Sequence, residues 1–444
     1  MKSPHWPIRS KGIVKLDLKR MYAALKLLDN PHLKLPPVIH CAGTNGKGST
    51  LAFLQSILEK ANYSVHKYVS PHLINFNERI ILNGEEIKDD YLFEILEECR
   101  IKVDEHIANI TFFEGVTLAA MIAFSRIKAD FVLLEVGLGG ILDATNVIPN
   151  PLIVILTSIS FDHTDFLGNT IESIAQNKCG IIKENCSIIG AKQEFPIVHQ
   201  IIEAHRKNNI RYSFGLDWDI IYDENEDFFT YIDQNKKINL PLPNLLGEHQ
   251  IYNAVTAIAA SVVINNYIND NNIKNNKLIT INNIIDGITS AKWNGRLQKI
   301  KINHFNQIFS PSHYQIIFDG AHNAGGAKVL ADYLKKQKNK SILIIGMTKN
   351  KDIEEFIKIL LPYIEDIYTV CVNSEPLAMH SNILSEKIIE VIKNNDYQIN
   401  CYDSDNIENA FNTINKNCNF IDNDIKNIII TGSLFLFSDL MKYL

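Results

Sequence analysis

The feature that most constrains the fold of this chain is a glycine-rich turn between an apolar strand pattern and an amphipathic helix pattern. Val38 and Ile39 precede the turn, and apolar residues recur after it at spacings of three and four: Leu51, Leu54, Ile57 and Leu58. A strand, a tight turn and a helix in this order form half of a parallel βαβ unit. The pattern therefore predicts a parallel sheet with a ligand-binding turn at its edge.

The turn has the composition of a phosphate-binding loop. Its residues are Gly43, Thr44, Asn45, Gly46, Lys47, Gly48 and Ser49. Glycines let the backbone turn tightly and point its N–H groups inward, and a lysine meets the charge of the terminal phosphates. The stricter pattern G-x-x-x-x-G-K-[ST] fails, because Cys41 replaces its first glycine and Gly48 follows the lysine. A glycine-rich structural turn with an incidental surface lysine is the alternative, but the flanking strand and helix favour phosphate binding.

Length and composition limit the remaining possibilities. The 444 residues, 46% of them hydrophobic, exceed what one core needs and indicate two or three domains. A formal net charge of -6 leaves no basic stripe for a nucleic-acid partner. Seven scattered cysteines without a C-x-x-C pair disfavour disulfides and zinc.

The start lacks an apolar signal core and runs such as 131–136 are too short for a bilayer, so we expect a cytoplasmic protein without a membrane partner. A monomer is the default.

Further apolar runs with β-branched residues predict buried strands. They are Phe131 to Val136, Ile153 to Ser158, Gln315 to Phe318, Ser341 to Ile345 and Ile428 to Ile430. Helical stretches separate most of them, so the predicted class is α/β. Most of the turns that carry chemistry follow the carboxyl ends of these strands, where open parallel sheets bind ligands.

A domain boundary is predicted near Leu297, because Trp293 to Arg296 precede a polar stretch and a fresh series of strands and helices. Residues 1–297 are then a phosphate-loop mononucleotide-binding domain with a mostly parallel sheet, and residues 298–444 a smaller Rossmann-like α/β domain. Short aromatic runs among Asp and Asn predict a small β insertion from Gly215 to Pro243. The asparagine-rich stretch from Ile264 to Ile284 predicts a solvated connection.

The loop form G-T-N-G-K-G-[ST] resembles that of the Mur ligase superfamily, and in particular its folate branch, folylpolyglutamate synthase and dihydrofolate synthase. Further motifs of this branch follow in order: Ser70-Pro71-His72-Leu73, Phe76-Asn77-Glu78-Arg79, Phe112-Phe113-Glu114, Leu134 to Gly140, Asp143-Ala144-Thr145-Asn146, Asp162-His163-Thr164, Gly295-Arg296, Asp319 to Asn323, and Thr431 to Leu434. The resemblance implies an ATP-dependent, Mg²⁺-requiring amide ligase that adds L-glutamate to dihydropteroate or reduced folates through an acyl phosphate. It also implies that residues 298–444 form the glutamate-ligase domain.

The resemblance assigns Mg²⁺ binding to Ser70, Glu135 and His163. Glu135 suits this role on its chemistry, since Mg²⁺ takes one or two protein oxygens beside the nucleotide phosphates. Histidine is an unusual ligand for so hard an ion, and a simple turn at Asp162-His163 is the alternative. Lys178 matches a lysine that the family carbamylates to N6-carboxylysine, which requires a lowered pKa and a neutral amine. A plain helix-surface lysine is the alternative there.

Further nucleotide and substrate contacts are implied by the resemblance. Asn253, Arg296 and Asp319 match positions that contact ATP, and His322 and Ser433 match positions near the incoming glutamate or the acyl phosphate. Arg296 can grip phosphate oxygens bidentately, although a lone arginine more often forms a surface ion pair. Catalysis is then positioning and charge neutralisation. The catalytic candidates are Lys47, His163, Lys178, Arg296 and His322.

Thr111, Phe112, Phe113 and Glu114 resemble the segment that lines the pterin site, where an aromatic ring covers the flat heterocycle. Two adjacent phenylalanines in the core are the alternative. The sequence departs from the family at Ile141, where arginine is common after Gly139-Gly140. The change removes a positive charge near the predicted metal and phosphate site.

Two other functions remain open. A Mur-type cell-wall ligase is a close alternative, but the stretch before Val38 is too short for a UDP-binding domain of about 100 residues. A phosphate-loop switch or motor ATPase is less compatible with the sequence, because such a protein does not need the second half of the chain, which contains the motif Asp319 to Asn323.

Overall fold

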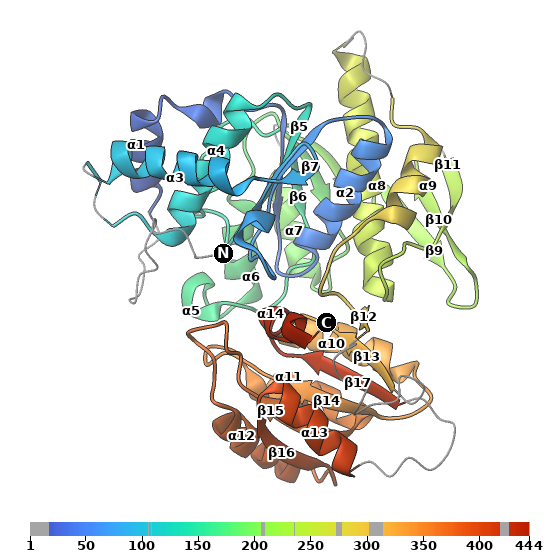
Figure 1. Ribbon diagram of the computed structural model, residues 1–444. Helices are drawn as coiled ribbons and strands as arrows, with labels where there is room; N and C mark the ends of the chain where they lie inside the picture. The colour runs from blue at the N-terminus through green and yellow to red at the C-terminus, as the bar shows by residue number, and fades with distance from the viewer. Residues whose placement is uncertain are drawn as a thin grey trace. The chain divides into compact units, whose positions relative to one another are not determined.

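The computed structural model describes residues 17–104, 106–107, 109–205, 209–234, 236–271, 278–301, 314–417 and 426–443. The start of the chain and Cys418, one of the seven cysteines, lie outside these ranges. The chain divides into two compact units, one of residues 1–244 with 250–292 and one of residues 245–249 with 293–444. Each unit is an α/β structure around one main sheet (Figure 1).

The first unit contains an eight-stranded sheet of order β4-β3-β2-β5-β1-β6-β7-β8. All neighbours from β2 to β8 in this order are parallel, and β3 and β4 extend the sheet antiparallel at one edge. Its strands are β1 (Val38–Ala42), β2 (Val65–Tyr68), β3 (Ile80–Leu82), β4 (Glu85–Glu86), β5 (Phe131–Glu135), β6 (Ile153–Leu156), β7 (Ser187–Gly190) and β8 (Ile210–Ser213). The predicted strands at 131–136 and 153–158 are confirmed within one or two residues, and the strand predicted from Val38 and Ile39 continues three residues further, to Ala42.

Helices pack against this sheet and bury its apolar strands (Figure 1). The helices of this unit are α1 (Leu18–Leu27), α2 (Lys47–Lys60), α3 (Asp89–Val103), α4 (Phe112–Arg126), α5 (Thr164–Leu167), α6 (Ile171–Cys179), α7 (Pro196–Ala204), α8 (Glu248–Asp270) and α9 (Ile281–Ser290). One core joins α1, α3 and α4 to the sheet and another joins α6 and α7 to it. The side-chain oxygen of Thr170 accepts from Ser173 N and starts α6, a capping contact that stabilises a helix by about 1 kcal/mol.

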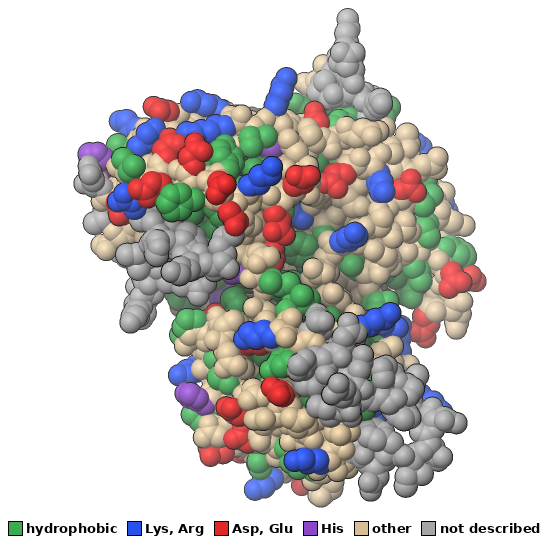
Figure 2. Space-filling view, in the orientation of Figure 1, with side chains coloured by type: hydrophobic (Ala, Val, Ile, Leu, Met, Phe, Trp, Pro, Cys, Tyr) green, Lys and Arg blue, Asp and Glu red, His purple; other side chains and the backbone are tan. Residues whose placement is uncertain are grey.

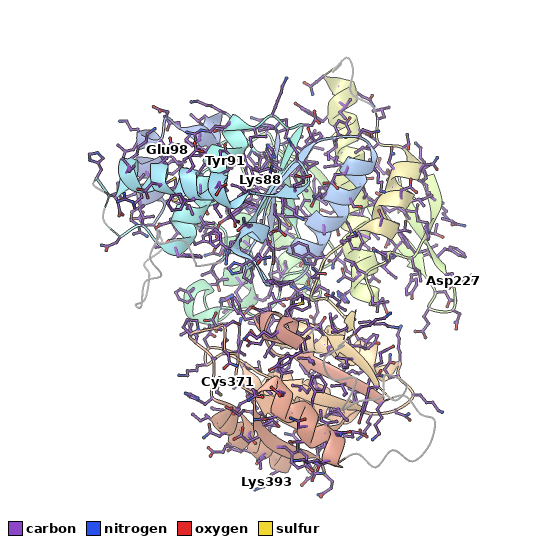
Figure 3. All side chains as sticks on the ribbon, viewed as in Figure 1. Lys88, Tyr91, Glu98, Asp227, Cys371 and Lys393 are labelled. Carbon is purple, nitrogen blue, oxygen red and sulfur yellow. The ribbon has the colours of Figure 1, made fainter. Side chains whose placement is uncertain are left out.

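A separate three-stranded antiparallel sheet follows β8, as the β insertion predicts. It consists of β9 (Trp218–Tyr222), β10 (Phe228–Asp233) and β11 (Lys236–Pro241). Asp227 lies in the turn between β9 and β10 (Figure 3). Trp218 is 2% exposed and its ring meets Phe214 edge-on at 5.2 Å, so an aromatic contact anchors the insertion.

The predicted solvated connection from 264 to 284 is wrong at both ends. Helix α8 continues to Asp270 and α9 begins at Ile281, leaving residues 272–277 outside the described chain. Ile264, Ile268 and Ile279 are buried, so apolar packing overrides the loop preference of the asparagines. Helix α8 is also long and apolar enough by composition to cross a membrane, with a mean hydropathy of 1.3. Since 67% of that window is buried in the protein, it fits a core helix.

The second unit is built on a six-stranded sheet of order β12-β13-β17-β14-β15-β16, in which only β12 is antiparallel. Its strands are β12 (Gln298–Ile300), β13 (Tyr314–Phe318), β14 (Ser341–Ile345), β15 (Ile364–Val370), β16 (Asn400–Asp405) and β17 (Lys426–Thr431); its helices are α10 (Ala324–Lys335), α11 (Ile353–Leu360), α12 (Ser381–Asn394), α13 (Ile407–Asn417) and α14 (Leu436–Leu440). The α/β class predicted for both parts of the chain is confirmed.

On the face that Figure 2 shows, Lys and Arg side chains are interspersed with Asp and Glu side chains. The six cysteines in the described ranges are free thiols, in line with the expectation from their spacing.

Candidate active site

The predicted phosphate loop lies between β1 and α2, in the first unit. Gly46 is the residue before α2 and has a φ of 86°, which a residue with a side chain rarely adopts. The helix thus begins at Lys47, and its first N–H groups are directed out of the helix end where anions bind. Lys47 Nζ donates to the carbonyl oxygens of Gly43 and Thr44, both at 3.1 Å.

The loop after β6 supports the phosphate loop from the side. Thr44 N donates to Ser158 O at 2.8 Å, and Thr44 Oγ1 donates to Ser160 O at 2.9 Å. Gly43 lies so close to Thr157 that a Cβ atom on Gly43 would overlap Thr157 Oγ1. The glycine is therefore required by close approach to a neighbouring strand end.

Asn253, on α8, lies against the same loop. A Cβ atom on Gly46 would come within 2.5 Å of Asn253 Oδ1. The amide of Asn253 is oriented by Gln250, whose Oε1 accepts from Asn253 Nδ2 at 3.0 Å. Gln250 is fully buried, and the sequence had not singled it out. The structure therefore brings Asn253 to the phosphate loop although 207 positions separate Gly46 from Asn253 in the sequence.

Glu135, at the end of β5, is 4% exposed, and its Oε2 accepts from Ser70 N at 3.2 Å. The structure thus brings together two of the three predicted metal ligands. His163 precedes α5 with a φ of 52°, and its Nε2 lies 3.8 Å from Asp162 Oδ2. Among the residues that the structure describes, no group of three His, Cys, Asp or Glu is close enough to hold a metal by itself. A metal here would need oxygens from a bound nucleotide or water.

Lys178, on α6, is a buried amine and not a surface lysine. It is 5% exposed, and its Nζ donates to Gly43 O at 2.9 Å, on the phosphate loop. Burial, followed by the charge of Lys47, lowers the pKa of Lys178 to about 7, against the opposing effect of Asp162 and Asp143. An amine with this pKa is substantially neutral near pH 7.

The Gly139-Gly140 turn packs closely on α6. A Cβ atom on Gly140 would lie 2.5 Å from Asn177 O and 2.9 Å from the Cα of Lys178. Ile141 follows with 45% of its surface exposed, and its N–H donates to Asn177 O at 3.0 Å. The position where the family commonly has arginine is thus at the surface, with its backbone bonded to the residue before Lys178.

The predicted pterin segment lies at the start of α4, where its polar groups are used structurally. Thr111 and Glu114 form a reciprocal cap, with Glu114 N donating to Thr111 Oγ1 at 3.1 Å and Thr111 N donating to Glu114 Oε2 at 2.8 Å. Glu114 also forms an ion pair with Arg20 at 2.9 Å and is 5% exposed. Thr111 and Glu114 therefore position the helix start that presents the two phenylalanines.

The two phenylalanines of this segment have different surroundings. The ring of Phe112 meets Phe76 edge-on, and the guanidinium of Arg79 lies 5.5 Å from the Phe112 centroid. Phe113 lies against Gly137, two residues after Glu135, so closely that a Cβ atom on Gly137 would overlap its ring. Phe113 is thus the member of the segment that reaches the loop of Glu135.

The predicted residues of the second unit gather at the carboxyl ends of β13 and β17, which are neighbouring parallel strands. Asp319 accepts from Leu297 N at 2.8 Å and from Ala321 N at 2.9 Å. Burial raises the pKa of Asp319, although the charge of Arg296 and these hydrogen bonds oppose the effect. The guanidinium of Arg296 lies against Gly320, where a Cβ atom would be 2.9 Å from Nη1.

His322 and Ser433 belong to the same strand ends. His322 Nδ1 donates to Gly320 O at 2.8 Å. Ser433 is 5% exposed and its Oγ accepts from Phe435 N at 3.3 Å. Gly432 N donates to Ala321 O at 3.0 Å and ties the two turns together.

Comparisons with known proteins agree with this arrangement. Residues 41–261 match the model of the Mur ligase middle domain, and residues 298–443 match that of the dihydrofolate synthetase C-terminal domain. The chain is 31% identical over 447 residues to a dihydrofolate synthase/folylpolyglutamate synthase of Bacillus subtilis, covering 98% of this chain and 96% of the relative. It is 34% identical over 365 residues to the Escherichia coli protein of the same name, covering 81% of this chain and 77% of the relative.

Solved structures show the same relationship. The Escherichia coli FolC structure in complex with DHPP and ADP superposes with a TM-score of 0.81 at 30% identity, covering 98% of this chain and 94% of that one. A bifunctional folylpolyglutamate synthase/dihydrofolate synthase with Mn, AMPPNP and L-glutamate bound gives a TM-score of 0.78 at 25% identity, covering 97% and 94%. The chain belongs to the dihydrofolate synthase/folylpolyglutamate synthase family of ATP-dependent ligases, within the Mur ligase superfamily.

Proposed function

We propose that this protein joins L-glutamate to dihydropteroate, to reduced folates or to both, at the expense of ATP. One observation carries the proposal: the buried amine of Lys178 lies on the first glycine of a phosphate loop. A loop that only binds ATP does not require a second lysine, and burying one is costly. In a carbamylating ligase the same position needs a neutral amine, which the lowered pKa supplies.

The reaction has two steps. The substrate carboxylate first attacks the γ-phosphorus of ATP, forming an acyl phosphate and releasing ADP. The α-amine of glutamate then attacks the acyl carbon, so that an amide bond forms, phosphate leaves and the amine loses a proton. Lys47 neutralises phosphate charge in the first step, and catalysis is mainly positioning and charge stabilisation.

Mg²⁺ is the metal we propose, held by Ser70, Glu135 and His163. The sparse protein donor set supports this, because Mg²⁺ keeps several waters and takes only one or two protein oxygens beside nucleotide phosphates. When bound, the ion neutralises the charge that develops on the transferred phosphoryl group. Glu135, which already accepts one backbone N–H, is the donor that fits best.

We assign the nucleotide contacts of the first unit to the loop from Gly43 to Ser49 and to Asn253. Residues 1–297 are the proposed ATP-binding domain. The pterin ring is proposed to contact Thr111, Phe112, Phe113 and Glu114, with the flat face on an aromatic ring. The closeness of Phe113 to Gly137 supports Phe113 as the main contact.

Residues 298–444 are the proposed glutamate-ligase domain. Arg296 and Asp319 are assigned to ATP, and His322 and Ser433 to glutamate or the acyl phosphate. Their grouping at two adjacent strand ends supports this, since open parallel sheets bind ligands there. The hydrogen bond from His322 Nδ1 to Gly320 O at 2.8 Å fixes the orientation of the ring at these strand ends.

We further propose that the protein acts as a monomer in the cytoplasm, with dihydropteroate or folates, L-glutamate and ATP as its partners and with neither nucleic acid nor membrane. Size-exclusion chromatography with light scattering tests the monomer. A mass near 50.4 kDa is expected, and a mass of twice that value would refute it.

The decisive experiment is mass spectrometry of products formed from dihydropteroate or tetrahydrofolate with ATP, Mg²⁺ and L-glutamate. A gain of one glutamate on either acceptor is the expected result, and the acceptor used distinguishes the two synthase activities. ATP consumption should require both the acceptor and glutamate. Equal ATP turnover without either would instead identify an ATPase and overturn the ligase proposal.

A further inference from the structure

A buried histidine in the centre of the first sheet has no assigned role. His40 lies on β1, between β5 and β6, and is 0% exposed. Its Nε2 lies 2.8 Å from Thr145 Oγ1, and its Nδ1 has no hydrogen-bond partner in the described part of the chain. Burial, with a smaller effect of Lys183, lowers the pKa of His40 to about 3, so the ring is neutral. Burying an imidazole with one unpaired nitrogen costs free energy. Its presence in the core therefore calls for an explanation, and the hydrogen bond at the other nitrogen supplies one.

The direction of the hydrogen bonds follows from Asp143. Its Oδ2 accepts from Gly137 N at 3.0 Å and Leu138 N at 2.9 Å, and its Oδ1 accepts from Thr145 N at 2.9 Å. The Thr145 hydroxyl donates its single proton to Asp143 Oδ1 at 2.5 Å. Thr145 Oγ1 can therefore only accept from His40, which sets the Nε2–H tautomer.

This chain of hydrogen bonds ends on a segment that links several site elements. Gly137 and Leu138 follow Glu135 by two and three residues. Gly137 lies against Phe113, and Gly140 lies against the backbone of Lys178. The carboxylate of Asp143 thus holds the backbone between the proposed metal ligand and the proposed carbamylated lysine.

We propose that His40 is a positioning residue for this segment, acting through Thr145 and Asp143. The inference rests on the proposed function, because it assumes that Glu135 and Lys178 serve the ligase reaction. His40 Nε2–H holds the Thr145 hydroxyl in the rotamer that donates to Asp143. Asp143 in turn fixes the Gly137 and Leu138 amides and thereby the direction of Glu135.

Residues that orient metal ligands through hydrogen bonds in other proteins indicate the size of the effect. Removing such a residue typically lowers metal affinity or activity 10–100-fold. The loss should appear mainly in the apparent Mg²⁺ activation constant and in kcat. The KM for ATP should change little, because the phosphate loop itself is held by Ser158 and Ser160 instead.

Two pairs of variants separate positioning from mere core packing. His40→Leu and Thr145→Val remove the donor and the hydroxyl while keeping similar volume, whereas His40→Gln and Thr145→Ser retain a donor and a hydroxyl. Thr369→Val is the matched control: Thr369 is also 0% exposed, and its Oγ1 donates to Ser381 O at 2.9 Å on β15 in the second unit.

The first readout is hydrogen–deuterium exchange of the peptide that contains residues 136–142, which does not depend on activity. His40→Leu and Thr145→Val should raise its exchange rate by about tenfold or more, because a local opening that is easier by about 1.4 kcal/mol is about ten times more populated. His40→Gln, Thr145→Ser and Thr369→Val should exchange like the wild type. The double variant His40→Leu/Thr145→Val should exchange no faster than Thr145→Val, since both changes break the same series of hydrogen bonds.

The second readout is steady-state kinetics with Mg²⁺ titration. We expect a 10–100-fold higher apparent Mg²⁺ activation constant or lower kcat in the two disruptive variants, with near wild-type values in the three others. Wild-type exchange and kinetics in Thr145→Val would overturn the positioning role. Equal losses of activity in Thr369→Val would show that the effects come from general destabilisation, and this would also overturn the positioning role. A wild-type protein without Mg²⁺-dependent glutamate ligation would instead refute the proposed function, while the exchange result would still stand.

Discussion

Replacing Lys178 with methionine should stabilise the protein and abolish its activity. Lys178 is 5% exposed, and its Nζ donates to Gly43 O at 2.9 Å. In the unfolded chain its pKa returns to about 10.4, so most of the molecules must lose a proton or bury a charge on folding. Methionine has similar length and no charge to bury.

The magnitude follows from the pKa. The ordinary value of 10.5 and the folded value of about 7 differ by about 3.5. At about 1.4 kcal/mol per pH unit this is about 5 kcal/mol, an upper value because the coupled charge of Lys47 contributes. Methionine also loses the hydrogen bond to Gly43, worth about 1–3 kcal/mol. We therefore expect Lys178→Met to raise the free energy of unfolding by about 2–4 kcal/mol at pH 7.

The pH dependence gives the sharper test. Between pH 7 and about 10 the unfolded state binds a proton at Lys178 that the folded state does not, so wild-type stability rises with pH. The advantage of Lys178→Met should therefore shrink by about 1.4 kcal/mol per pH unit above pH 7 and be constant below it.

Urea unfolding of both proteins at pH 6, 7, 8 and 9, in buffer depleted of bicarbonate to prevent carbamylation, measures this difference. Lys393→Met, at an exposed position of α12 (Figure 3), is the control and should change stability by the same amount at each pH. A Lys178→Met advantage that stays constant from pH 7 to 9 would refute the lowered pKa. Lower stability of this variant at every pH would refute the burial cost.

Three further changes test other parts of the site. Gly43→Ala forces a Cβ atom onto Thr157 Oγ1, so calorimetry should show at least about tenfold weaker ATP binding; unchanged binding would contradict the close approach. Phe113→Ala should raise the KM for dihydropteroate at least about tenfold with the KM for ATP unchanged, and a selective rise in the latter would argue against a pterin contact. Ile141→Arg adds a positive charge beside the residue that precedes Lys178 and should lower the Lys178 pKa further. Urea unfolding without bicarbonate should then show stability beginning to rise below pH 7, and an onset unchanged from the wild type would exclude the coupling.

Local pattern was sufficient for the phosphate loop and the strands around it. Gly43, Gly46 and Lys47 were predicted correctly as a turn between β1 and α2, because glycine and period-specific apolar spacing act within a few residues. The asparagine-rich stretch failed for the converse reason. Ile264, Ile268 and Ile279 are buried, and burial outweighs the weak loop preference of neighbouring asparagines.

The sequence by itself therefore determined the strand and helix that flank the phosphate loop, several further strands and the family motifs, since each of these is written in contiguous residues. Only the tertiary structure decided what the motifs contact. It placed Asn253 on Gly46, buried Lys178 on Gly43, and used Thr111 and Glu114 to cap a helix. These contacts join positions far apart in the chain, and a pKa or a hydrogen bond depends on what surrounds a group, which spacing along the sequence does not specify.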